Sequence, residues 1–131
     1  MLKVKIFSFS YLYSGIPEDA SGHGGGFVFD CRYIKNPGRV FEFMQLTGKD
    51  KEVKEYLEGI PDMLELIENS LNIVSKAIDT FISRDFTDLM VSFGCTGGRH
   101  RSVYAAEQLA SRLYHKYQDK IEIVLKHTAL D

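Results

Sequence analysis

The stretch VSFGCTGGRHRSVYAAEQLASRL, which runs from Val91 to Leu113, constrains the fold of this chain more than any other. An apolar run ends at Gly94, and glycines, hydroxyl groups and cations fill the next positions. Apolar residues then recur every three or four positions, which predicts a helix with one buried face. They are Val103, Ala106, Ala110, Leu113 and Tyr117. The stretch therefore predicts a strand, a tight loop and the first turns of a helix.

The remainder of the chain repeats this alternation. Branched, aromatic or alternating runs predict strands at Leu2 to Ser10, Phe27 to Ile34, Leu89 to Phe93 and Ile121 to Leu125. A short helix is predicted over Val53 to Leu57, and a longer one starts near Pro61. Strands separated by helices predict an α/β fold of the three-layer type, in which helices flank a mainly parallel four-stranded sheet. A length of 131 residues suits one domain, residues 1–131.

Composition and charge argue against several classes of protein. The net charge of −2 disfavours a nucleic-acid binder that is driven by electrostatics. No apolar run approaches the roughly 20 residues that cross a bilayer. Two cysteines, Cys31 and Cys95, give no disulfide framework, so we expect a reducing cytoplasm. The histidines show no ligand spacing, and we expect neither a metal ion nor a cofactor.

The loop that follows the predicted third strand has the composition of an anion site. The first turn of a helix leaves amide groups without intrahelical acceptors, and the helix dipole makes that end positive. Glycines let the backbone approach a ligand, hydroxyl groups donate hydrogen bonds, and guanidinium or protonated imidazole groups hold an anion. The candidate residues are Thr96, Gly97, Gly98, Arg99, His100, Arg101 and Ser102. We expect them to bind a phosphate, with Arg101 as a bidentate partner.

A catalytic alternative uses the same loop. Cys95, Gly98, Arg101 and Ser102 fit the pattern C-x-x-G-x-x-R-[ST] of cysteine-dependent phosphatases, in which a thiolate attacks the bound phosphate. Gly94 occupies the position where those enzymes usually carry a histidine. A general acid would have to come from elsewhere in the fold, and Asp19, Asp30 and Asp50 are the candidates.

Asp30 and Arg32 flank Cys31 and are expected to share one face of the second strand. Two interpretations remain open for them. They form a local ion pair at the strand end, or Arg32 adds charge to the anion site while Asp30 contacts a sugar hydroxyl or amine. The second interpretation follows from the position of ligands beyond the carboxyl ends of strands in α/β sheets.

Four motifs, in the same order along the chain, resemble those of the C-terminal domain of the RNase adapter protein RapZ family. GCTGGRHRSVYAAEQLA is similar to the family's G-C-T-G-G-K-H-R-S-V-x-x-A-E-x-L. FSFSYLYSGIPEDA, FVFDCRYIKNP and LTGKDKEVKEYL resemble its other three signatures. The resemblance covers nearly all 131 residues. It implies a version of this domain without the family's N-terminal nucleotide-binding module, since no G-x-x-x-x-G-K-[ST] is present.

The resemblance also implies a function and its residues. The family's domain binds an aminosugar phosphate, and its enterobacterial member also binds small RNAs. Carried onto this sequence, the phosphate site falls on Thr96, Gly97, Gly98, His100, Arg101 and Ser102, with Asp30, Arg32 and Asn36 as further candidates. The segment KIEIVLKHTALD lacks the basic cluster of the RNA-binding member, which disfavours RNA as a partner. We expect a ligand-sensing or adapter domain for a small phosphorylated metabolite, and leave self-association open.

Overall fold

The computed structural model describes residues 1–130 and contains one four-stranded parallel sheet. Its strands are β1 (Leu2–Ser10), β2 (Phe27–Asp30), β3 (Asp88–Cys95) and β4 (Ile121–His127), in the spatial order β2-β3-β1-β4. All three neighbouring pairs are parallel. The predicted α/β class and the parallel sheet are therefore confirmed.

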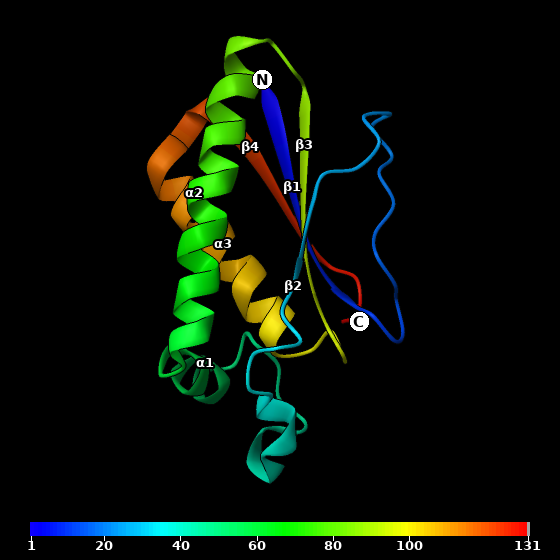
Figure 1. The fold of residues 1–131 in the computed structure, drawn as a ribbon, viewed down its shortest axis with the longest axis vertical. Helices are drawn as coiled ribbons and strands as arrows, with labels where there is room; N and C mark the ends of the chain where they lie inside the picture. Colours follow the sequence, from blue (N-terminus) through cyan, green and yellow to red (C-terminus); the bar gives the residue numbers. More distant parts are fainter. Residues whose placement is uncertain (131) are drawn as a thin grey trace.

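The helices are α1 (Lys51–Glu58), α2 (Pro61–Ser83) and α3 (Arg101–Tyr117), and they lie on one side of the sheet (Figure 1). Three short 3-10 helices complete the structure: η1 (Pro37–Arg39), η2 (Phe41–Phe43) and η3 (Gln118–Lys120). The segment of residues 11–26 crosses the other side of the sheet (Figure 1). The layer opposite the helices is thus an extended loop.

The core lies between the sheet and the helices. Every second residue of β1 from Leu2 to Ile6 is buried, whereas Lys3 and Lys5 are partly exposed on the opposite face. The helices contribute apolar residues at spacings of three and four, including Ile67, Val74 and Ile78 of α2 and Ala106, Leu109 and Leu113 of α3. Each fully buried leucine or isoleucine side chain stabilises such a core by about 1.5–3 kcal/mol.

Three strand ends differ from the prediction, and one of them is that of β4, which continues two residues past the predicted Leu125 to His127. β2 ends at Asp30, four residues before the predicted end, because the Asp30 carboxylate accepts a hydrogen bond from the Arg32 amide at 2.9 Å and turns the chain. β3 continues to Cys95, since the Cys95 carbonyl accepts from the Tyr11 amide at 3.0 Å. Both strands therefore finish beside the start of α3, at the lower end of the molecule in Figure 1.

No helix within residues 1–130 is both long and apolar enough to cross a membrane.

Candidate functional site

The loop between β3 and α3 presents free amide groups. No backbone or side-chain acceptor within residues 1–130 pairs with the amides of residues 96–101. Gly98 adopts a φ of +66°, and a Cβ at this position would lie 2.6 Å from Cβ of Ala129 and 2.8 Å from the Ser10 amide nitrogen. Only glycine fits there. Because these amides also stand at the amino end of α3, the helix dipole adds positive potential to the loop.

Arg101, the first residue of α3, carries a buried guanidinium group. The side chain is 3% exposed, and Nη1 donates to the carbonyls of Arg32 at 2.9 Å and Ile34 at 2.8 Å. Within residues 1–130, Nε and Nη2 have no hydrogen-bond partner, and Arg101 forms no ion pair. Nε and Nη2 form the side edge of the guanidinium plane, which is suited to a bidentate anion.

Arg99 and His100 hold a second segment against the loop. Arg99 donates from Nε to the carbonyl of Leu46 at 2.9 Å and from Nη2 to that of Gln45 at 2.7 Å. Nε2 of His100 contacts the carbonyl oxygen of Phe43 at 2.9 Å. Burial lowers the pKa of His100 below its usual range, and the nearby Arg99 and Arg101 add to this effect. The ring is therefore neutral at pH 7 and donates to Phe43 without adding charge to the loop.

Asp30 and Arg32 form a local ion pair at the end of β2. The Arg32 side edge holds the carboxylate, with Nε 2.9 Å from Oδ1 and Nη2 2.7 Å from Oδ2. The guanidinium carbon also lies 3.8 Å from the centre of the Tyr11 ring. The hydrogen bonds from Arg32 hold the pKa of Asp30 below its usual range. The two charges are thus paired with each other at the surface beside the loop, which favours the first of the two interpretations for these residues.

Cys95 and Ser102 close the bottom of the loop. Sγ of Cys95 lies 3.1 Å from Oγ of Ser102, and it accepts from the Ser102 amide at 3.4 Å. Both side chains are buried. Oγ of Ser10 donates to the carbonyl of Thr96 at 2.6 Å, which fixes the loop from the β1 side. The side chain of Ser102 is therefore engaged inside the protein, and Thr96 is the exposed hydroxyl of the loop.

Two hollows open at this end of the sheet. The first, of about 440 Å³, contains the loop, and the second, of about 360 Å³, lies on its β2 side. The first is lined by Tyr13, Asn36, Gly38, Cys95, Thr96, Gly97, Arg99, His100, Arg101 and Ala129. The second is lined by Arg32, Ile34, Lys35, Asn36, Arg39, Thr96 and Arg101. Among the described residues, no carboxylate lines either one. The structure thus brings together every predicted site residue except Gly98, Ser102 and Asp30, which support the walls.

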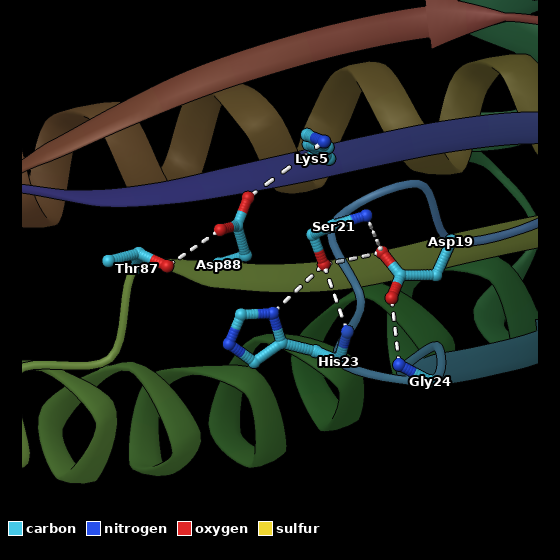
Figure 2. Close-up of polar contacts among 7 residues, drawn as sticks. All are labelled: Lys5, Asp19, Ser21, His23, Gly24, Thr87 and Asp88. Carbon is cyan, nitrogen blue, oxygen red and sulfur yellow. Dashed lines mark hydrogen bonds and ion pairs between the residues drawn. The ribbon is translucent and has the colours of Figure 1, made fainter.

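A separate polar cluster lies in the glycine-rich segment before β2 (Figure 2). Oδ1 of Asp19 accepts from the Ser21 hydroxyl at 2.6 Å, and Oδ2 accepts from the Gly24 amide at 2.8 Å. These hydrogen bonds, first of all those from Ser21, lower the pKa of Asp19 far below its usual range. His23 contacts the same Ser21 hydroxyl at 3.0 Å. The cluster shapes its own loop, and within residues 1–130 no group of three or more His, Cys, Asp or Glu is arranged to hold a metal ion.

A family model described as the RapZ C-terminal domain matches residues 2–131. The chain belongs to the RapZ C-terminal domain family. A "Nucleotide-binding protein" of Thermosipho melanesiensis is 38% identical to it over 128 residues, which is 95% of this chain and 41% of that protein. A protein of the same name from Bifidobacterium adolescentis is 44% identical over 115 residues, 86% of this chain and 34% of that protein. The chain spans about 40% of the length of the first of these relatives.

This RapZ-type domain contains one hydrogen-bonded chain that sequence reasoning missed. Oγ of Ser8 in β1 contacts Nδ1 of His127 in β4 at 2.5 Å, and Nε2 of His127 contacts the Glu107 carboxylate of α3 at 2.7 Å. Ser8 is fully buried, so the hydroxyl is inaccessible to a substrate. The sequence shows only a serine, a histidine and a glutamate that lie far apart along the chain, and no spacing rule predicts that they meet.

Proposed function

We propose that this domain binds the phosphate group of a small metabolite at the loop of residues 96–101. The observation that carries the proposal is the state of Arg101. Buried cations in proteins are ordinarily paired, because an unpaired buried charge costs several kcal/mol. The Arg101 side edge has no such partner within residues 1–130, while the adjacent loop amides also lack acceptors. One oxyanion would satisfy both sets of donors at once.

A sugar phosphate is the ligand class that fits the surroundings. The first hollow offers Thr96, Asn36 and Tyr13 as neutral polar groups for hydroxyls, and its volume of about 440 Å³ exceeds that of a phosphate ion. The family resemblance makes an aminosugar phosphate the first compound to test. The relatives' name, "Nucleotide-binding protein", is compatible with a phosphate site but names a different ligand. We assign the domain a ligand-sensing or adapter role in the cytoplasm, with a protein partner downstream; the net charge of −2 disfavours RNA in that place.

The test is a calorimetric titration of the protein with glucosamine 6-phosphate and with glucosamine. The phosphate ester is expected to bind and the free sugar to bind at least about tenfold more weakly, since it lacks the charge-assisted hydrogen bonds. Amide chemical shifts provide a second reading that needs no variant. The changes should centre on residues 96–101. Equal affinity for the two compounds, or shifts confined to another region, would refute the phosphate site.

A variant with an exposed side chain avoids the risk of unfolding the protein. Thr96→Ala removes one hydroxyl at the border of both hollows and should weaken binding several-fold. Thr80→Ala, on the exposed face of α2, is the matched control and should bind like wild type. Arg101→Lys keeps the charge but loses the side edge, and should weaken binding more than Thr96→Ala does.

A cysteine-dependent phosphatase is the second candidate, because Cys95 lines the same hollow and its sulfur contacts Ser102. Two features disfavour it. The three candidate acids are engaged elsewhere: Asp19 with Ser21, Asp30 with Arg32, and Asp50 with the Thr47 amide. A side chain at Gly94 would lie 2.3 Å from the Phe9 ring, so a histidine does not fit. Hydrolysis of p-nitrophenyl phosphate that Cys95→Ser abolishes in a folded protein would overturn the binding proposal in favour of catalysis.

A further inference from the structure

We propose that the natural ligand carries two anionic groups, and that the second one binds between Lys35 and Arg39 in the hollow on the β2 side. This inference rests on the proposed phosphate site and specifies the ligand class. The chemistry is that of a small bisphosphorylated metabolite, with one phosphate at the loop amides and one at the exposed cations.

The two hollows are joined by three residues. Asn36, Thr96 and Arg101 line both of them, so the floor between the hollows is continuous. Arg101 is fixed in this shared position by the carbonyls of Arg32 and Ile34, which hold Nη1. Asn36 is fixed as well, because Oδ1 accepts from the Gly38 amide at 2.9 Å and caps η1. A ligand that spans both hollows would lie across a preformed surface.

The charges around the second hollow are unbalanced. It is lined by Arg32, Lys35, Arg39 and Arg101, and among the described residues no carboxylate lines it. Arg32 is already neutralised by Asp30 at 2.7 Å. Lys35 and Arg39 are exposed and form no ion pair within residues 1–130. Nζ of Lys35 lies 6.0 Å from the centre of the Tyr56 ring, a contact that leaves its charge uncompensated. A chain with a net charge of −2 therefore keeps two cations without an ion pair among the described residues beside the buried Arg101, where an additional anion would be attracted.

The positions of Lys35 and Arg39 are set by the turn between β2 and η1. Lys35 precedes Asn36, and Arg39 is the last residue of η1, whose amide donates to the Asn36 carbonyl at 3.2 Å. The turn thus brings the two cations to the same hollow, although four positions separate them. Their long side chains can adjust to the ligand, whereas Arg101 cannot. The second subsite is therefore expected to add affinity more than geometric selectivity.

The experiment compares glucose 1,6-bisphosphate with glucose 6-phosphate by calorimetry, for wild type and for the double variant Lys35→Ala/Arg39→Ala. Wild type is expected to bind the bisphosphate about tenfold more tightly than the monophosphate. The double variant should lose that advantage and keep the affinity for the monophosphate within about twofold. Raising the salt concentration should reduce the advantage in wild type as well.

The matched control is Lys116→Ala/Lys120→Ala, which removes the same charge near the far end of α3 and should behave like wild type. Equal affinity of wild type for the two sugar phosphates would overturn the second subsite and leave the first intact. An equal loss of affinity for both compounds in the double variant would also overturn it. Lys35 and Arg39 would then attract any anion by long-range electrostatics and would not bind a second phosphate. If neither compound binds and glucosamine 6-phosphate does not bind either, the proposed function itself fails. Displacement of the bisphosphate by a short single-stranded RNA at physiological salt would overturn the proposal, because RNA would then be the ligand of this surface.

Discussion

Residues of the same type in the loop make different contacts, and these contacts decide which of them can bind an anion. Arg99 and Arg101 both lie at the start of α3. Nε and Nη2 of Arg99 donate hydrogen bonds to the carbonyls of Leu46 and Gln45. Arg101 uses only Nη1 in this way. Within residues 1–130 the side edge of Arg101 has no hydrogen-bond partner, whereas that of Arg99 is engaged. The sequence predicts two cations near an anion, but which donors remain free depends on which carbonyls fold beside them.

Gly98 and Gly97 form a natural pair for testing the loop backbone. Gly98→Ala should lower the free energy of unfolding by about 2–4 kcal/mol, because φ is +66° and the new Cβ would meet Ala129 and Ser10. Gly97→Ala should change it by less than about 0.5 kcal/mol, since a Cβ there meets no atom within 4 Å. Urea unfolding measures both. Similar losses in the two variants would contradict the assigned backbone geometry.

His100 should make the protein less stable as the pH falls from 7 toward 5. Burial lowers the pKa of the folded-state imidazole below the ordinary value of about 6.5. The unfolded chain therefore takes up a proton in this range before the folded protein does, and the stability present above pH 6.5 is lost as the pH falls. His100→Gln, which can still donate to Phe43, should flatten the slope, and the exposed His115→Gln should not. An unchanged slope in His100→Gln would exclude His100 as its source.

At the scale of elements, the sequence predicts the strands, helices and loop well, because each is set by local spacing. The ends of β2 and the contacts of α3 are less predictable. β2 stops where the Asp30 side chain captures the Arg32 amide, and a pattern of aromatic and branched residues continues past that point. The contact of Glu107 with His127 joins α3 to β4, and no spacing rule relates these positions. Such long-range pairs depend on the sheet order, which places β4 beside β1.

The chain of hydrogen bonds through His127 is expected to connect β1, β4 and α3. His127→Ala should lower the free energy of unfolding by roughly 2 kcal/mol, because it removes two hydrogen bonds and leaves the buried Ser8 hydroxyl without its partner. The exposed His115→Ala is the control and should be near neutral. A double-mutant cycle with Glu107→Ala, read by chemical denaturation, isolates the His127–Glu107 term. A coupling energy near zero would show that the two side chains do not stabilise each other.

For the whole molecule, the loop of residues 96–101 holds together segments that are distant in sequence. Arg101 holds residues 32 and 34, Arg99 and His100 hold residues 43–46, and Gly98 packs against Ala129. Gly48 completes the arrangement, because its amide donates to the Arg99 carbonyl at 2.9 Å and a Cβ there would lie 2.3 Å from the His100 carbonyl oxygen. A ligand that fixes residues 96–101 should therefore stabilise several separate segments together.

Hydrogen exchange should show this coupling as a pattern across the molecule. With a bound phosphate ester at about 100 times its dissociation constant, the folded state gains about 2.7 kcal/mol. Amides that open only by global unfolding gain the full protection, so the informative ones are those that exchange by local opening. Among these, residues 32–34, 43–48 and 96–101 should slow together, whereas the turn before β3, at residues 84–87, should not. Slowing limited to residues 96–101 would mean that Arg99, His100 and Arg101 hold the neighbouring segments equally well without a ligand. Binding of an anion at the loop would then leave the local stability of the other segments unchanged.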